Sequence, residues 1–229
     1  MTCKMCNGGM FLGLVAAGAL TASAISLSNT SVFAQTAAPA KAEPPAKDVK
    51  KEQKVATAKV GETAPDFTLT DTDGKTVSLA EWTKSGNTVV LEWFNPGCPF
   101  IVKHHEKNPT FANLSKEFKD KKVAFLAINT GASKADLAKA KKDWNIAYPV
   151  ALDTDGKVSK MYGAKTTPHC FVIAADGKLV YSGAIDNDSD MAKAGDKNYV
   201  KAALDEILAG KKVTTAETKP YGCPVKYQN

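Results

Sequence analysis

The stretch of sequence that decides the fold is residues 91–105, which read Leu91-Glu92-Trp93-Phe94-Asn95-Pro96-Gly97-Cys98-Pro99-Phe100-Ile101-Val102-Lys103-His104-His105. An apolar run typical of a buried strand ends at a Pro-Gly turn, and the turn delivers Cys98 to the start of an expected helix. Free backbone amides and the positive end of a helix dipole stabilise a thiolate there and lower the pKa of the cysteine. The stretch therefore predicts a nucleophilic thiol, and the alternative is a buried structural cysteine.

Strand and helix patterns alternate on both sides of this stretch. A hairpin is expected from residues 66–70 and 76–79 around a turn at 71–74, and an antiparallel pair from 171–174 and 178–181. Further strands are predicted at 88–94 and 122–129, and helices at 99–107, 111–118, 133–144, 158–162 and 199–208. Such alternation is typical of an α/β fold, in which helices cover the faces of a sheet.

The first 59 residues are predicted to lie outside this fold. Lys4 precedes an apolar run at 10–20, and Val32-Phe33-Ala34 has the small residues that a signal peptidase accepts, so residues 1–34 are interpreted as a signal peptide. The alternative is an uncleaved membrane anchor. Residues 35–59 are rich in Ala, Lys and Pro and are expected to form a disordered linker. These features predict an exported protein of the periplasm or cell envelope.

The cysteine count favours a working thiol, and the charge pattern argues against a nucleic-acid partner. The chain has five cysteines, and removal of the predicted signal peptide takes away Cys3 and Cys6. Cys98, Cys170 and Cys223 remain, and in an oxidising compartment an odd number leaves one free or joined to another molecule. The net charge is +6, but the basic side chains, all lysines, are scattered without interleaved aromatic residues. The pattern favours a solvated surface and excludes nucleic acid as a predicted partner.

Three separate motifs resemble the redoxin branch of the thioredoxin superfamily, which includes peroxiredoxin-like proteins of the alkyl hydroperoxide reductase and thiol-specific antioxidant type and exported thiol-disulfide oxidoreductases. The motifs are Ala64-Pro65-Asp66-Phe67-Thr68-Leu69, the turn at 93–100, and Lys165-Thr166-Thr167-Pro168-His169. The resemblance implies a thioredoxin-like fold over residues 60–212, with a central mixed sheet flanked by helices and an N-terminal β-hairpin. Residues 213–229 then form a C-terminal tail that carries Cys223.

The resemblance also implies roles for individual residues. Cys98 corresponds to the attacking cysteine, and Pro168 to the proline that follows a cis peptide bond beside that thiol. A cis bond turns the backbone of Thr167 toward an extended substrate, and Pro99 and Phe100 are expected to complete the substrate-binding surface.

A resolving thiol is needed as well. Ile101 stands where a thioredoxin has its second cysteine, so that thiol must come from elsewhere in the chain. Cys223, in the sequence Tyr221-Gly222-Cys223-Pro224, is favoured. Cys170 is the alternative, unless it is a core residue.

Two reactions are compatible with such a site. In thiol-disulfide exchange, the Cys98 thiolate attacks a disulfide of a protein or small molecule. In a peroxiredoxin-type peroxidase, Thr and Pro precede the cysteine and an Arg polarises the peroxide. Here Asn95 and Leu91 hold those two positions and the chain has no Arg, so Lys103, His104 or His105 would have to supply the cation. The expected enzyme is therefore a thiol-disulfide oxidoreductase, with peroxide reduction as the alternative.

Metal or partner binding without turnover is a further alternative. Cys98 with His104, His105 or His169 would offer copper a Cys/His site, although copper chaperones of this fold usually bring two cysteines in one motif. The run Asp186-Asn187-Asp188-Ser189-Asp190 has alternating oxygen ligands but lacks the glycine of a calcium loop. The sequence therefore predicts no metal and no cofactor.

Overall fold

The structure is a computed structural model that describes residues 57–227. The predicted signal peptide and nearly all of the predicted linker lie outside the described residues. Within 57–227, every helix is too short or too polar to cross a membrane.

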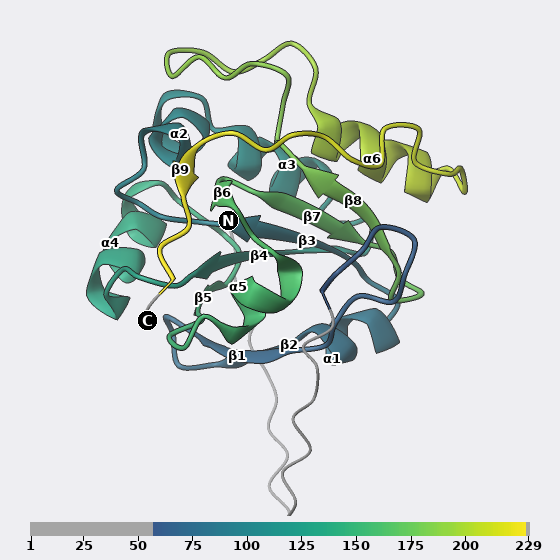
Figure 1. The fold of residues 1–229 in the computed structure, drawn as a ribbon, viewed down its shortest axis with the longest axis horizontal. Helices are drawn as coiled ribbons and strands as arrows, with labels where there is room; N and C mark the ends of the chain where they lie inside the picture. The colour runs from purple at the N-terminus through teal and green to yellow at the C-terminus, as the bar shows by residue number, and fades with distance from the viewer. Residues whose placement is uncertain (1–56, 228–229) are drawn as a thin grey trace, which may run out of the picture. The chain divides into compact units, whose positions relative to one another are not determined.

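A mixed sheet of seven strands forms the centre of the domain, in the order β2-β1-β5-β4-β3-β7-β8 (Figure 1). Its central strands β3, β4 and β5 are parallel, and β1, β7 and β8 pair antiparallel with their neighbours. The strands are β1 (Thr68–Asp71), β2 (Thr76–Ser78), β3 (Thr88–Trp93), β4 (Val123–Asn129), β5 (Val150–Leu152), β7 (Cys170–Ile173) and β8 (Leu179–Gly183). A separate two-stranded sheet joins β6 (Thr166–Thr167) to β9 (Cys223–Pro224).

Helices cover both faces of the seven-stranded sheet. They are α1 (Leu79–Lys84), α2 (Pro99–Val102), the π-helical turn η1 (Lys103–Lys107), α3 (Thr110–Glu117), α4 (Lys134–Asp143), α5 (Lys157–Tyr162) and α6 (Tyr199–Leu208). Apolar side chains of α2, α3, α4 and α6 pack in one buried cluster, and those of α1 and α5 pack in another. Alternate residues of β3 supply the two clusters, since Val90 belongs to the first and Val89 and Leu91 to the second.

The architecture confirms the predicted fold class. The N-terminal hairpin, the two central strands and the helix over 199–208 lie where the sequence places them. One boundary was wrong, because Leu79 begins α1 instead of ending the hairpin. Ser78 caps that helix by accepting a hydrogen bond from the Glu81 amide at 3.4 Å.

The helix predicted over 99–107 is also divided. It is α-helical only as far as Val102 and then continues as η1, which ends at Lys107. The wider π-helical turn is the part that carries Lys103, His104 and His105, all of which are buried.

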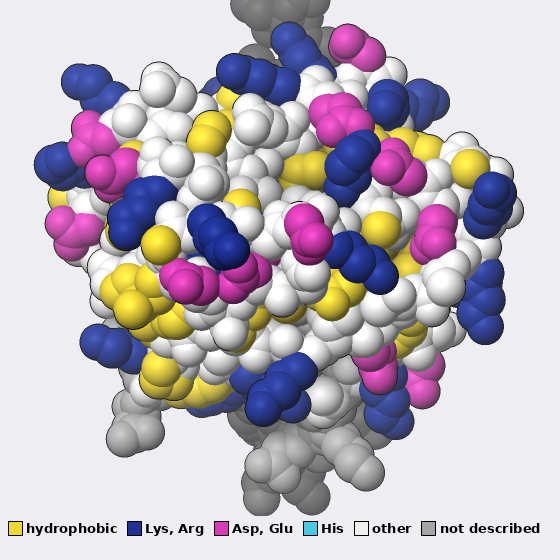
Figure 2. Space-filling model, turned by 90° about the horizontal axis from the view of Figure 1, so that it is seen from above, with side chains coloured by type: hydrophobic (Ala, Val, Ile, Leu, Met, Phe, Trp, Pro, Cys, Tyr) yellow, Lys and Arg dark blue, Asp and Glu magenta, His cyan; other side chains and the backbone are white. Residues whose placement is uncertain are grey.

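Charged side chains are mixed on the surface. On the face drawn in Figure 2, lysines and acidic residues are interspersed and do not separate by sign. This face therefore carries the scattered charge that the sequence predicts.

Candidate active site

The turn between β3 and α2 holds Cys98 beyond the carboxyl end of a central strand of the sheet. Asn95 shapes the turn, because its side-chain oxygen accepts from the Gly97 amide at 2.9 Å and its carbonyl from the Cys98 amide at 2.9 Å. Cys98 is the N-cap of α2, and Pro99 occupies the first helical position. The predicted location of the thiol is thus confirmed, although only 1% of the residue is exposed.

The loop that carries Pro168 lies directly against this thiol. The Thr167-Pro168 peptide bond is cis, as predicted. The Cys98 Sγ donates to the Thr167 carbonyl at 3.0 Å, and the Trp93 amide donates to the His169 carbonyl at 2.9 Å. The second bond fixes the loop to the end of β3, so the backbone of Thr167 and the thiol keep a defined separation.

The C-terminal tail covers the same loop. In the β6–β9 pair, Thr167 lies opposite Cys223 and Thr166 opposite Pro224, and the Val225 amide donates to the Lys165 carbonyl at 3.0 Å. Gly222 has a φ of 133°, and a Cβ there would overlap the Thr167 carbonyl oxygen. Only glycine therefore fits at this position, and the close approach brings Cys223 to Cys98.

The two thiols have opposite pKa shifts. Burial opposes the Cys98 thiolate, but hydrogen bonds from the side chains of Cys223 and Thr167 and from the backbone at Cys223 and Ile101 outweigh it, and the pKa of Cys98 is lowered. Burial, with the neighbouring Cys98, raises the pKa of Cys223 to about 11. The Cys98 thiol therefore ionises more readily than the Cys223 thiol, which is the arrangement of a nucleophile with a nearby second thiol.

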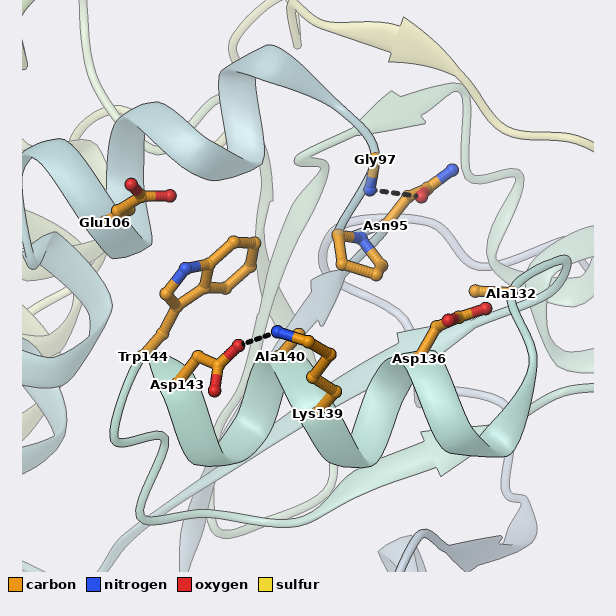
Figure 3. Close-up of a pocket in the computed structure, with 10 residues that line it drawn as sticks. Asn95, Gly97, Glu106, Ala132, Asp136, Lys139, Ala140, Asp143 and Trp144 are labelled. Carbon is orange, nitrogen blue, oxygen red and sulfur yellow. Dashed lines mark hydrogen bonds and ion pairs between the residues drawn. The ribbon is translucent and has the colours of Figure 1, made fainter.

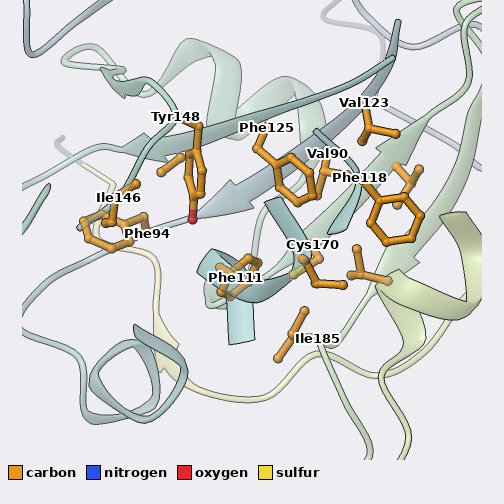
Figure 4. Close-up of a cluster of buried hydrophobic side chains, with 14 of the residues drawn as sticks. Val90, Phe94, Phe111, Phe118, Val123, Phe125, Ile146, Tyr148, Cys170 and Ile185 are labelled. Carbon is orange, nitrogen blue, oxygen red and sulfur yellow. The ribbon is translucent and has the colours of Figure 1, made fainter. Parts of the chain in front are cut away.

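Cys170 lies in a different environment. It is fully buried in β7, opposite Glu92 of β3, among the core side chains that Figure 4 shows. Burial raises the pKa of its thiol well above the ordinary value, and the Glu92 carboxylate adds to the shift. The structure thus places the Cys170 side chain in the core, the second of the two predicted settings.

A buried polar cluster anchors the tail at Tyr221. The Tyr221 hydroxyl donates to Asp186 and lies 2.8 Å from the His104 Nε2 and 3.3 Å from the Lys103 Nζ. Its ring packs against Phe100, with ring centroids 5.7 Å apart. Burial lowers the pKa of His104 to about 4, more than Asp186 raises it. Lys103 and His104 are thus engaged by Asp186 and Tyr221.

A second buried cluster centres on Glu92. Its two carboxylate oxygens accept from the His105 Nε2 at 2.8 Å and the Tyr148 hydroxyl at 3.2 Å. The His105 ring stacks between Phe111 and Trp144, at centroid distances of 5.1 and 5.6 Å. None of the three basic residues that were considered as a replacement for arginine is therefore free to serve a bound peroxide.

Several of these residues were missed by the sequence analysis. Glu92 had a visible signal, since it is an acidic residue inside an otherwise apolar strand. Asp186 was considered only as a calcium ligand, and Tyr221 and Gly222 only as parts of the tail. Their roles depend on contacts between distant segments, which spacing does not reveal.

The predicted substrate-binding residues surround the thiol unequally. Pro99 is exposed and Phe100 is half-buried beneath Tyr221, whereas Thr167 is buried. A groove lies on the other side of the turn, between Asn95-Pro96-Gly97 and α4 (Figure 3). Trp144 borders it, and Lys139 is paired with Asp143. Cys98 does not line this groove, so the groove borders the reactive site without containing the thiol.

The metal alternatives find no support in the part of the chain that the structure describes. Within it, no group of three or more His, Cys, Asp or Glu side chains has the arrangement of a metal site. Asp186 instead accepts from the amides of Asp188 at 3.2 Å and Gly195 at 2.6 Å. His169 accepts from the Lys165 amide at 3.2 Å and contacts the Ser182 hydroxyl at 3.3 Å.

The geometry predicts how the Cys98 thiol titrates. Because the pKa of Cys98 is lowered, its alkylation rate should reach a plateau at a lower pH than that of an ordinary cysteine, whose pKa is 9.0. Cys223→Ala removes one donor to the thiolate and should move the midpoint to higher pH. Rates of iodoacetamide modification at Cys98, followed by peptide mass mapping, measure both midpoints. A variant midpoint equal to or below that of the wild type would contradict the assigned hydrogen bond.

Comparison with known proteins places this geometry in context. The sequence matches the profile of the Redoxin family over residues 59–204. The thiol-disulfide oxidoreductase ResA of Bacillus subtilis (strain 168) is 35% identical over 120 residues, which cover 52% of this chain and 64% of that protein. ResA of Bacillus thuringiensis subsp. konkukian is 30% identical over 131 residues, which cover 57% of this chain and 70% of that protein.

Two solved structures are similar to this fold. A hypothetical protein from Sinorhizobium meliloti 1021 has a TM-score of 0.66 and 27% identity, and the match covers 75% of this chain and 96% of that one. A putative thiol:disulfide interchange protein DsbE from Chlorobium tepidum has a TM-score of 0.51 and 26% identity, and the match covers 67% and 98%.

Proposed function

Because the chain belongs to the redoxin family, a branch of the thioredoxin superfamily, we propose that it is a thiol-disulfide oxidoreductase with Cys98 as nucleophile and Cys223 as resolving thiol. The observation that carries this proposal is the position of Cys223 on the loop beside the nucleophile, since Cys223 pairs with Thr167 and the Thr167 carbonyl accepts from the Cys98 Sγ at 3.0 Å. The pKa is lowered at Cys98 and raised at Cys223, which supports the two roles. The proposed substrates are disulfides of polypeptides or small molecules, and we use "client" for a polypeptide substrate.

The reaction has two exchange steps. The Cys98 thiolate attacks one sulfur of the client disulfide, so that a Cys98–client disulfide forms and the other client sulfur leaves as a thiolate. Cys223 then loses its proton and attacks the Cys98 sulfur. The Cys98–Cys223 disulfide forms and the second client sulfur leaves, so that the client is reduced and the enzyme oxidised. A dithiol reductant restores the pair.

The surroundings of Cys98 favour this reaction over peroxide reduction. A peroxidase needs a donor or cation that polarises the O–O bond at the thiolate. His105 is paired with Glu92, and Lys103 and His104 with Asp186 and Tyr221. Thiol-disulfide exchange asks less of the surroundings, since the client supplies both sulfurs.

The proposal extends to export. The sequence of residues 1–34 supports a signal peptide, and an oxidising compartment suits an enzyme with two exchanging thiols. Mass spectrometry of the protein isolated from cell envelope and periplasm should find an N-terminus at Gln35. An intact Met1 N-terminus in the cytoplasm would contradict export.

Replacement of Cys223 tests the role of the resolving thiol. Cys223→Ser should accumulate the Cys98–client mixed disulfide, because Cys170, the remaining thiol of the described residues, is fully buried in the core. Turnover should fall by about 10²-fold or more, with the first exchange step less affected. Non-reducing gels of the variant mixed with a disulfide-linked peptide, followed by peptide mapping, measure the trapped species.

Cys170→Ser is the matched control, since it removes the other thiol of the domain. It should leave the mixed disulfide as short-lived as in the wild type. If Cys170→Ser traps the client and Cys223→Ser does not, Cys170 is the resolving thiol.

A further inference from the structure

We propose that residues 219–227 form a displaceable strap that occupies the client-binding edge of the site. A client and the strap then compete for pairing with the backbone of Thr167. This inference rests on the proposed function. In addition, the strap would control access to Cys98 and would couple the second exchange step to release of the client.

The first observation is the place where the strap pairs. Strand β6 is two residues long, and β9 of the strap is its pairing partner in a sheet separate from the central one. An unpaired strand edge next to a reactive thiol is a surface on which an extended polypeptide can add as a strand. In this structure the strap fills that edge with a cysteine of its own, so Cys223 lies opposite Thr167, where a client cysteine would have to be presented.

The second observation is the burial of Cys98. Only 1% of the residue is exposed, and Tyr221 and Cys223 are among the side chains packed against its cluster. A thiolate has to approach a client sulfur in line with the disulfide that it breaks. With the strap in place, a small reagent has little access and a folded or extended polypeptide has none.

The third observation is how the strap is held. Its pairing segment is short, and its two ends are fixed by tyrosines. Tyr221 is anchored to Asp186 and His104, and the Tyr227 hydroxyl donates to the carbonyls of Ala164 at 2.5 Å and Ser159 at 3.2 Å. These contacts lie outside the seven-stranded sheet, so the strap can leave without breaking a strand of the core.

These observations define an exchange cycle. With the strap displaced, the client pairs with Thr167 and forms a disulfide with Cys98, releasing its first thiolate. Return of the strap brings Cys223 to Cys98 and removes the client strand from the same edge. Cys223 then displaces the second client sulfur, and resolution and product release become one event.

The strap also indicates which client segments fit. A Cβ at Gly222 would overlap the Thr167 carbonyl oxygen, because the two backbones approach closely there. A client in the same register is therefore expected to have glycine directly before its cysteine.

Gly222→Val in the full chain is the direct test, because the side chain should expel the strap from Thr167. The measurement compares Cys98 modification by a bulky polymer-linked maleimide with that by iodoacetamide, in a Cys223→Ser background so that the strap carries no thiol. The ratio of the two rates cancels changes in the thiolate fraction. We expect Gly222→Val to raise the bulky-to-small ratio by tenfold or more.

Gly210→Val is the matched control. Gly210 also has a positive φ, of 70°, but a Cβ there meets no atom within 4 Å, so backbone strain is introduced without a clash. Its ratio should equal that of the parent. Tyr221→Phe is a milder second variant, which keeps the ring on Phe100 but removes the hydroxyl, and it should raise the ratio in the same direction. Equal ratios in all variants that retain the wild-type circular dichroism spectrum would overturn the proposal.

A peptide completes the test. A labelled peptide of residues 219–227, with serine in place of Cys223, should bind the Gly222→Val, Cys223→Ser protein at least tenfold more tightly than the Cys223→Ser parent in fluorescence anisotropy. The same peptide with valine in place of its glycine should not bind. Equal binding to both proteins would contradict the claim that the strap and a client bind the same edge at Thr167. The proposed function fails separately, if the wild type forms no Cys98–Cys223 disulfide on oxidation.

Discussion

Cys98→Ser should abolish disulfide reduction, with a loss of turnover of about 10³-fold or more. The reacting species is the thiolate, and a serine hydroxyl does not ionise at neutral pH or form a disulfide. The change is nearly isosteric at a residue that is 1% exposed, so the fold should persist. Reduction of a disulfide-linked fluorescent peptide, with dithiothreitol as the final reductant, measures the loss.

The control for this experiment is Cys170→Ala, because Cys170 is a buried thiol of the same domain. Its side chain is fully buried in the core and takes no part in the proposed cycle, so turnover should stay within about twofold of the wild type. Stability should fall by about 1 kcal/mol, as expected when a small buried group is removed. Full activity of Cys98→Ser, or loss of activity in folded Cys170→Ala, would reassign the nucleophile.

The parts of the fold that could be predicted from the sequence are those set by local chemistry. The apolar run of β3, the Pro-Gly turn and Pro99 together place a helix start at Cys98, and the structure confirms that placement. The Thr167-Pro168 bond is cis, as the resemblance to redoxins implies. The strand, the turn and the helix start are encoded within a few neighbouring residues, whereas the cis bond was expected from the family resemblance.

The buried polar clusters could not be predicted in the same way. The sequence analysis considered His104 and His105 as a cation for a bound peroxide or as copper ligands, whereas both are buried and hydrogen-bonded within the fold. His105 meets Glu92 from 13 residues away and His104 meets Tyr221 from 117 residues away. Whether a polar side chain is buried depends on which distant segments pack against it, and the local hydrophobic pattern of the sequence does not encode those contacts.

The Glu92 cluster gives the second large prediction, which concerns stability. Glu92→Ala should lower the free energy of unfolding by about 3–5 kcal/mol, because it leaves two buried partners without their acceptor. The residue is 1% exposed, and its carboxylate accepts from His105 and Tyr148. Denaturation by urea, followed by tryptophan fluorescence, measures the change. Glu106→Ala, at an exposed acidic position in the same region, should change stability by less than about 0.5 kcal/mol.

A double variant separates the cost of an unpaired partner from the net contribution of the pair. Glu92→Leu with His105→Phe replaces the Glu92–His105 pair by apolar side chains and leaves the Tyr148 hydroxyl as the one group that loses its acceptor. The phenyl ring can occupy the stack between Phe111 and Trp144. The double variant should therefore recover much of the stability that Glu92→Ala loses. If Glu92→Ala costs less than about 1 kcal/mol, the carboxylate does not stabilise the fold. The pKa of Cys98 should change little in either variant, because the groups that lower it are Cys223, Thr167 and Ile101. Unfolding therefore reports on the buried Glu92 cluster, and thiol titration reports on the contacts between Cys98 and the strap.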